Sequence, residues 1–359
     1  MQPAKTAAML ERWSPRSVAA TVRSRFGNRR PPRRAFLSWL VFLCFGGIPL
    51  RAEFPFSDRN WAIEAAFPDD PKTDGILTPS PQGDVKVQRF YWEPSNEHYL
   101  IARFEYPLAL RPGEEAGLYA KSFSELLKSR PGQVRGRDRF TLGPYEGEKL
   151  VIFQAREKSL REVRFVLIGS ILYMASAEWP EQGTGAPRAA QFFASLQVRP
   201  EFMNAREVAE NGRWRELGAG RFRLRYDATR WYRDPADQEA GIFSLLRVDQ
   251  RAEAQFIAEP NPIEGGDIER AVLETAKEGA ESVTVGRKGR KLRGAIEMTE
   301  LEFAARVDHV VYRNHGYFYS GPEGTVQLRG WATDKEYPGM EADITELLDG
   351  LSVATPTKK

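Results

Sequence analysis

The chain has 359 residues, of which 42% are hydrophobic and 28% charged, a composition typical of globular proteins that excludes bulk disorder. It is long enough for two domains, since single hydrophobic cores rarely exceed roughly 250–300 residues. The formal net charge is +3, but ten of the 52 basic residues and only one of the 49 acidic residues precede residue 53. The remainder carries a net charge of −6, which argues against nucleic acid as its main partner.

A leader segment occupies residues 1–52. Residues 23–34 are basic, residues 35–50 form an uncharged apolar run, and Ala52 is a small residue just beyond it. These are the parts of a secretory signal, and the run is shorter than the roughly 20 residues of a transmembrane helix. We expect a signal-type helix that directs export to the periplasm or the extracellular space, with cleavage after Ala52. The alternative is an uncleaved leader that anchors the chain in the inner membrane and provides its only membrane contact.

Two details of the leader refine this prediction. Arg33 and Arg34 precede Ala-Phe-Leu, which resembles the twin-arginine export signal; an ordinary basic region is the alternative. The single cysteine, Cys44, follows Leu43, where a lipoprotein signal requires a small residue, so we predict no lipid attachment. Removal of the leader would leave no thiol, which suits an oxidising compartment.

The rest of the chain shows the same order of seven predicted elements twice. They are a short alternating strand, a strand that ends at a proline turn, an amphipathic helix, three strands and a closing amphipathic helix. The first set is 61–68, 98–106, 116–127, 149–153, 163–168, 171–176 and 189–196, and the second is 222–226, 254–258, 267–277, 295–301, 309–312, 325–330 and 342–351. This order predicts an internal duplication. We expect a first domain at 53–198, a polar linker at 199–212, a second domain at 213–353 and a tail at 354–359.

Three segments of the first half carry a resemblance to a known family. They are Phe67-Pro68 at the end of the first strand, the hairpin at 166–173 around Gly169, and the closing helix at 190–196. The pattern resembles the PsbP/Mog1-like domains of exported bacterial proteins. The resemblance implies an α+β fold of two tandem domains, each a mainly antiparallel sheet packed with helices as an α/β/α sandwich. It also implies binding or assembly roles and no reaction. Extra residues at 317–324 depart from the pattern in the second half.

Histidine is the first residue type to consider for catalysis or metal binding, and the chain has His98, His309 and His315. On one continuous strand His309 and His315 would lie roughly 20 Å apart, at ~3.3 Å per residue, which is too far for one metal ion. We instead expect His315 and Gly316 at a turn, and we predict no metal site. Ser320 lacks the Gly-x-Ser-x-Gly context of a hydrolase nucleophile. We therefore predict neither catalytic residues nor a cofactor.

The strongest local charge cluster lies at 286–294 and contains Arg287, Lys288, Arg290 and Lys291. Such a cluster could form an anion patch that holds a phosphate or a membrane headgroup. The alternative, which we favour, is a solvated strand edge protected by its charge against further pairing. The basic segment at 135–139 occupies the equivalent place in the first half, which favours a structural or shared surface role.

Two aromatic runs, at 90–92 and 317–319, supply the candidate binding surface. In an alternating strand every second ring normally lies in the core, while its neighbours are exposed or covered by a partner. Because exposed aromatic side chains mark contact surfaces, we predict a binding surface at Tyr91, Trp92, Tyr317 and Tyr319.

These features favour an exported envelope protein that acts as a non-enzymatic binding or assembly module. Its partner would be another envelope protein or a small ligand, and not nucleic acid. Two alternatives remain. One is a periplasmic, hydrolase-like enzyme whose site is built from scattered residues, and the other is a protein held at the membrane by its leader.

Overall fold

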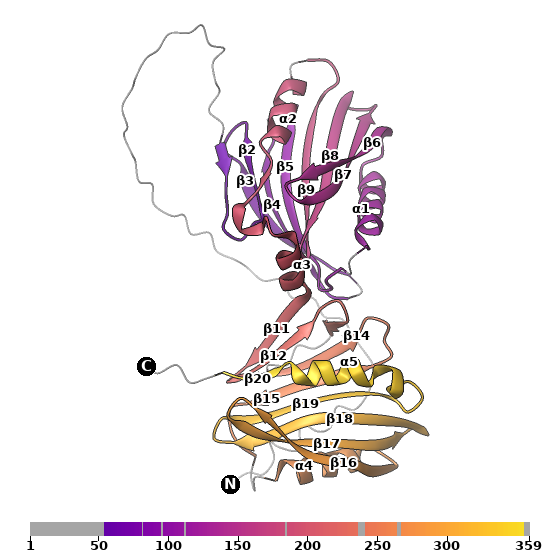
Figure 1. Cartoon of the computed structure of the whole chain (residues 1–359). Helices are drawn as coiled ribbons and strands as arrows, with labels where there is room; N and C mark the ends of the chain where they lie inside the picture. The colour runs from indigo at the N-terminus through magenta and orange to yellow at the C-terminus, as the bar shows by residue number, and fades with distance from the viewer. Residues whose placement is uncertain are drawn as a thin grey trace, which may run out of the picture. The chain divides into compact units, whose positions relative to one another are not determined.

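The computed structural model describes residues 54–80, 82–94, 96–110, 113–183, 185–235, 241–263 and 267–354. In these ranges the chain is an α+β protein of two tandem domains, each built around a seven-stranded antiparallel sheet (Figure 1). The predicted fold class is therefore confirmed. The leader at 1–52, with its predicted signal helix, lies outside the described residues. Among the described residues, no helix is both long and apolar enough to cross a membrane.

The first domain contains a large sheet, a small sheet and two helices. The large sheet has the order β3-β4-β5-β9-β8-β7-β6, with β3 at Lys72–Thr78, β4 at Val85–Trp92, β5 at His98–Glu105, β6 at Gln133–Leu142, β7 at Tyr145–Gln154, β8 at Ser159–Ile168 and β9 at Ile171–Pro180. The small sheet has the order β1-β2-β10, with β1 at Phe54–Phe56, β2 at Ile63–Phe67 and β10 at Gln197–Val198. The helices are α1 at Glu115–Ser129 and α2 at Gly185–Ala194.

Both faces of this large sheet are covered. On one face, α2 and the small sheet bury Trp61, Phe67 and Phe192 against the strands. On the other face, α1 packs through Tyr119 and Phe123. The resulting helix–sheet–helix layering is the sandwich that the sequence predicted, because each sheet face and each helix stripe buries its apolar side chains.

The second domain repeats this plan. Its large sheet has the order β13-β14-β15-β19-β18-β17-β16, with β13 at Trp231–Arg233, β14 at Ile242–Arg247, β15 at Glu253–Glu259, β16 at Ser282–Arg293, β17 at Ile296–Val307, β18 at Val310–Gly321 and β19 at Gly324–Thr333. The small sheet has the order β11-β12-β20, with β11 at Trp214–Ala219, β12 at Phe222–Asp227 and β20 at Leu351–Val353. The helices are α4 at Ile268–Glu278 and α5 at Tyr337–Asp349.

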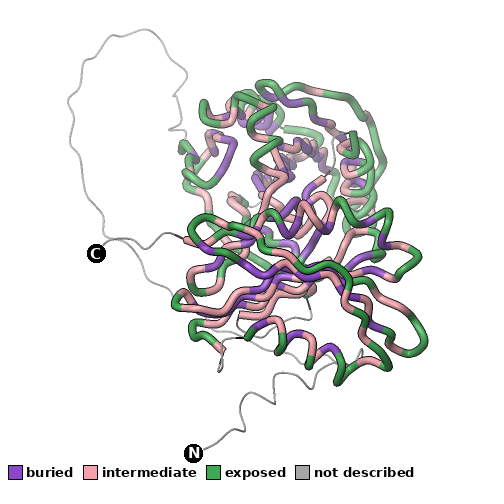
Figure 2. Tube along the Cα trace, turned by 60° about the horizontal axis from the view of Figure 1, so that its bottom comes forward, coloured by how far each residue is buried: buried purple, intermediate pink, exposed green. Residues whose placement is uncertain are grey.

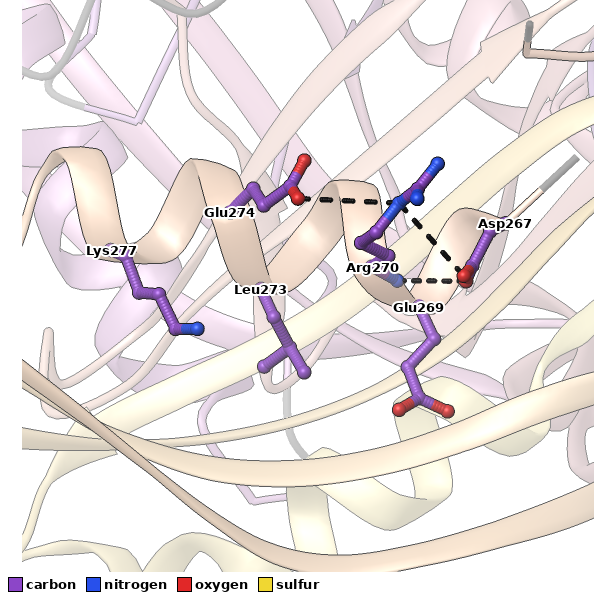
Figure 3. A pocket seen from close by; sticks show the side chains of 6 residues that line it. All are labelled: Asp267, Glu269, Arg270, Leu273, Glu274 and Lys277. Carbon is purple, nitrogen blue, oxygen red and sulfur yellow. Dashed lines mark hydrogen bonds and ion pairs between the residues drawn. The ribbon is translucent and has the colours of Figure 1, made fainter. Parts of the chain in front are cut away.

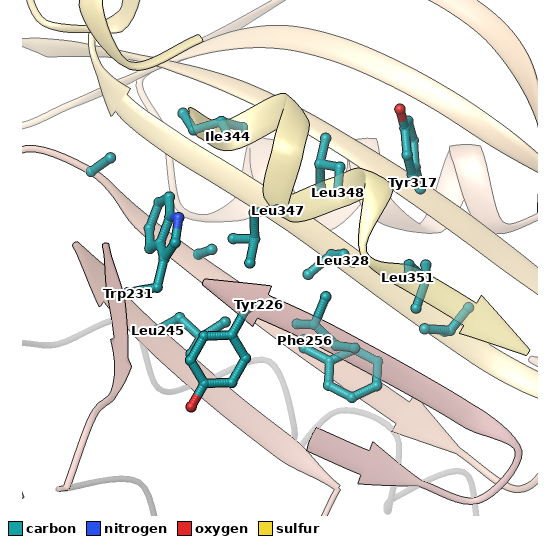
Figure 4. Close-up of a cluster of buried hydrophobic side chains, with 14 of the residues drawn as sticks. Tyr226, Trp231, Leu245, Phe256, Tyr317, Leu328, Ile344, Leu347, Leu348 and Leu351 are labelled. Atoms are coloured by element: carbon teal, nitrogen blue, oxygen red, sulfur yellow. The ribbon is translucent and has the colours of Figure 1, made fainter. Parts of the chain in front are cut away.

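The second large sheet is also covered on two faces. Helix α5 and the small sheet bury one face through a cluster that includes Trp231, Phe256 and Ile344 (Figure 4). Helix α4 covers part of the other face and begins after Asp267, whose side chain accepts a hydrogen bond from the Arg270 backbone, as expected for an N-cap. The buried residues follow the inner strands and β13, while the outer strand β16 is largely exposed (Figure 2).

The strand order of the two large sheets is the same when ten is added to each label of the first. Each of the fourteen strands and helices predicted for the repeat has a counterpart among the observed elements of the two domains. The segment that joins the halves contains a short helix, α3 at Ala205–Arg213, where the sequence predicted a polar linker. The extra residues of the second half lengthen the β18–β19 hairpin, which turns between Gly321 and Gly324.

Candidate functional site

The first aromatic run lies on β4, next to the outermost strand of the first sheet. Phe90 packs into the core, with its ring 4.3 Å from that of Phe56. Tyr91 and Trp92 are half-buried, and the Trp92 ring lies 5.5 Å from that of Tyr99. The two predicted surface residues of this run therefore retain part of their area for a contact.

The second aromatic run lies on β18, an inner strand of the second sheet. Tyr317 is 0% exposed, which corrects the prediction that it lies on a surface. Its ring belongs to the core under α5, because this face of β18 points toward the helix. Tyr319 is half-buried and donates a hydrogen bond to Glu323; burial, followed by this bond, raises the pKa of Tyr319 to about 12. Of the four predicted aromatic residues, Tyr91 and Trp92 thus lie in the sheet of the first domain, and Tyr317 and Tyr319 lie in the sheet of the second.

The predicted anion patch lies on β16, the outermost strand of the second sheet. Its cations have partners on neighbouring elements. Arg287 contacts two glutamates of β17, Lys288 pairs with Glu269 of α4, and Arg290 donates to Thr299. Lys291 lies 3.9 Å from Asp349. The anion patch and the charge-protected edge both stay predictions, since paired cations along an outer strand suit either.

The outer strands of the large sheets differ in how they are protected. Both β6 and β16 carry several arginines and a shift in register, between Val134 and Gly136 in β6 and between Val285 and Lys288 in β16. Strand β13 has only three residues. Bulges, charges and shortness are the usual devices that prevent a further strand from pairing with an edge.

Strand β3 has fewer of these devices: Lys72 and Asp74 are its only charged residues. It pairs with β4 through seven successive residues without a register shift, and no other described strand pairs with it. Ile76 and Leu77 are 47% and 63% exposed. Its one close ion pair is formed by Asp74 with Arg89 of β4. We call Lys72–Thr78 the β3 edge. Sequence reasoning missed this strand, although adjacent Ile76 and Leu77 before Pro79 were a readable signal.

His315 does not lie at a turn, which corrects that prediction. The turn is at Asp308 and His309, which both have positive φ, and His315 lies within β18 with its side chain 3% exposed. Its Nε2 atom lies 2.9 Å from Glu300 Oε1 and 3.9 Å from Glu302 Oε1. Its Nδ1 atom is buried and has no hydrogen-bond partner in the described structure.

Two further residues surround this cluster of Glu300, Glu302 and His315. Arg287 Nη2 lies 3.0 Å from Glu300 Oε1 and 2.7 Å from Glu302 Oε1. Tyr337 at the start of α5 has a buried hydroxyl without a partner among the described residues, and burial, with the nearby charge of Glu302, raises its pKa to about 12. Sequence reasoning missed this cluster because it placed a turn at His315.

Ser320 and a hollow on α4 do not form a catalytic arrangement. Ser320 Oγ accepts a hydrogen bond from the Ile263 backbone and lies 3.0 Å from Thr325 Oγ1, and neither partner is a base. A hollow on α4 is lined only by residues of that helix and its N-cap (Figure 3): Asp267, Glu269, Arg270, Leu273, Glu274 and Lys277. Since a hollow between side chains of one exposed helix does not enclose a substrate, we assign it no catalytic role.

The sequence matches no protein-family model and no curated protein. Among solved structures, CyanoP, the cyanobacterial PsbP of Synechocystis sp. PCC 6803, is 9% identical; the match covers 39% of this chain and 92% of CyanoP, with a TM-score of 0.32. A protein of Bacteroides thetaiotaomicron VPI-5482 is 12% identical, with 41% and 51% of the two chains covered and a TM-score of 0.28. The T6SS immunity protein TplEi of Pseudomonas aeruginosa is 10% identical, with 82% and 96% covered and a TM-score of 0.25. With identities of 9–12% and TM-scores of 0.25–0.32, these similarities carry no argument about the role of this chain.

Proposed function

We propose that this chain is an exported, non-enzymatic protein of the cell envelope that binds another protein by strand addition at the β3 edge. The observation that supports the proposal is the contrast among the four outer strands. Two of them have a register shift and several cations, and the third has only three residues, whereas the β3 edge has seven residues, no register shift and a single cation.

The backbone of the β3 edge is suited to strand addition. An outer strand presents a row of N–H and C=O groups that an extended segment of a partner can pair with. β3 pairs with β4 over its whole length without a register shift. The hydrogen-bond ladder can therefore continue regularly into a partner strand.

The side chains of the β3 edge favour an apolar partner strand. Ile76 and Leu77 are consecutive, so they point to opposite faces of the sheet. A partner with apolar residues on both faces would cover them, and burial of apolar surface stabilises the complex. Tyr91 shares a sheet face with Ile76, since Ile76 pairs with Val87 and Lys72 pairs with Tyr91. The half-buried Tyr91 ring extends the apolar surface beyond β3.

Site-specific cross-linking in intact cells tests the proposal. A photoreactive amino acid at Thr73 on the exposed edge should cross-link to a partner, and the double variant Ile76→Lys/Leu77→Lys should lose that adduct. Leu292→Lys is the matched control, because Leu292 is 69% exposed and lies on the charge-protected strand β16. The control should retain the adduct at Thr73.

Three results would contradict strand addition to another protein. They are an adduct that survives the double lysine substitution, an adduct lost equally in the Leu292→Lys control, and an adduct between two copies of this chain. Export is tested separately by mass spectrometry. An N-terminus at Glu53 in the envelope fraction supports a cleaved leader, and an intact leader in the membrane fraction supports the anchored alternative. A full-length chain in the cytoplasm would contradict export.

A further inference from the structure

The cluster of Glu300, Glu302 and His315 places three metal-ligating side chains on one face of two neighbouring strands. Glu300 and Glu302 are two residues apart on β17, so they share a sheet face. His315 on β18 lies directly opposite Glu302 in the antiparallel register. One donor atom from each of the three side chains lies within 4.8 Å of the other two. The sheet itself therefore holds the three donors together.

The His315 ring is almost fully buried beside the two carboxylates. Its side chain is 3% exposed and points its Nε2 atom at the two carboxylates, while its Nδ1 atom has no hydrogen-bond partner among the described residues. Burying a polar ring atom without a partner costs stability. That cost concerns Nδ1 alone, and the metal-ligating geometry lies at Nε2, which faces both carboxylates.

Arg287 marks the position of positive charge in the cluster. Its Nη2 atom lies 3.0 Å and 2.7 Å from the two glutamate oxygens, so it sits where a shared cation would bind. The Arg287 side chain is 59% exposed, and the Glu302 side chain is 30% exposed. The guanidinium can therefore move into solvent without disturbing the core, and the position that it leaves is accessible from outside.

We propose that Glu300, Glu302 and His315 form a binding site for a divalent transition-metal ion, which displaces Arg287. Two carboxylates balance the charge of the ion, and an imidazole with two carboxylates is a donor set that suits Zn²⁺, with water in a fourth position. Zn²⁺ binds oxygen and nitrogen at about 2.0–2.2 Å, so the donors need only small side-chain rotations to reach it. Mg²⁺ and Ca²⁺ prefer more oxygen ligands and should bind more weakly.

Isothermal titration calorimetry of the untagged full chain with ZnCl₂ tests the proposal. We expect one Zn²⁺ ion per chain at this site, and weaker binding of Mg²⁺. Glu302→Gln and His315→Gln should each weaken Zn²⁺ binding by about tenfold or more. Arg287→Gln should strengthen it by about tenfold, since a charge-assisted contact no longer has to be broken. His309→Gln is the matched control, because His309 also lies beside a glutamate but its ring is 91% exposed.

The Arg287→Gln variant separates a metal site from an ion-pair network. If the cluster is only a network, loss of Arg287 leaves two unneutralised glutamates, and Zn²⁺ binds neither the wild type nor the variant. That result would overturn the proposal, as would Zn²⁺ affinity that is unchanged by Glu302→Gln or reduced most by His309→Gln. Circular dichroism of each variant establishes that it is folded. If His315→Gln is not, the more exposed Glu302→Gln carries the test.

Discussion

The strands β3 and β13 occupy the same place in the two large sheets and differ in length and in burial. β3 has seven residues, and Ile76 and Leu77 on it are exposed. β13 has three residues, of which Trp231 and Tyr232 are only 1% and 4% exposed. A short strand whose side chains lie in the core offers a partner few backbone groups and little apolar surface. The two copies of the fold therefore share a strand order and differ in whether the sheet can be extended.

The opposite outer strands show that the difference is local. β6 and β16 both have an irregular register and cross-strand ion pairs, between Arg137 and Glu148 in one and between Arg287 and Glu300 in the other. An irregular register with ion pairs at this edge is thus common to both copies, while the other edge is short and buried only in the second. A binding role that uses the β3 edge accounts for this asymmetry.

The largest predicted effect is a difference in stability between a substitution in the buried strand β13 and one in the exposed strand β3. Trp231→Ala should lower the free energy of unfolding of the second domain by about 3–5 kcal/mol, because it leaves a cavity in the core of Figure 4. Urea unfolding combined with hydrogen exchange, which reports each domain separately, measures the loss. Leu77→Ala on β3 is the counterpart and should change stability by less than about 0.5 kcal/mol. Similar losses from both variants would show that β3 is structural like β13.

This contrast also explains which elements the sequence could predict. Inner strands and helices bury one face, so their apolar residues recur at regular spacing, as in β2 and α4. The β3 edge was not predicted because most of its residues are exposed and no alternation results. β13 was not predicted because three residues are too few to show a pattern.

The candidate metal site was not predicted from the sequence because one turn was placed at the wrong residues. Gly316 follows His315 and suggested a turn there, but the turn lies at Asp308 and His309, two non-glycine residues with φ of 48° and 65°. Asp and His adopt positive φ more often than most non-glycine residues but still rarely, so the turn could not be placed there from residue type alone. Gly316 lies within β18 for a different reason: a Cβ atom there would lie 2.6 Å from the Phe318 ring. With the turn misplaced, the pairing of Glu302 with His315 was not visible.

The second prediction removes the protection of β16 to make it resemble β3. In the triple variant Lys288→Thr/Arg290→Thr/Lys291→Thr the edge loses three cations and gains β-forming side chains. We expect stability to change by about 1 kcal/mol or less, since these contacts are largely exposed. Self-association, measured by light scattering, should rise with concentration. A variant that stays monomeric but loses binding to anionic vesicles would instead support the anion patch.

The smallest predicted effect concerns the one close ion pair of the β3 edge. Hydrogen bonds from Arg89 hold the pKa of Asp74 below its usual value, so the charged carboxylate stabilises the folded state. This stabilisation is present above the usual aspartate pKa of about 3.9 and is lost as the pH falls through the lowered pKa. Because both side chains are about one-third exposed, Arg89→Gln should cost only about 0.5 kcal/mol at neutral pH.

Urea unfolding of wild type and Arg89→Gln at pH 7 and pH 2.5, with NMR titration of the Asp74 carboxyl group, measures this effect. The difference in stability should shrink at the lower pH, and the Asp74 pKa should rise in the variant. Arg89→Lys keeps the charge and should retain part of the shift. A difference that persists at low pH would assign Arg89 a packing role instead. The stem of Arg89 would then stabilise the β3 edge by packing, and its charge pair with Asp74 would contribute little.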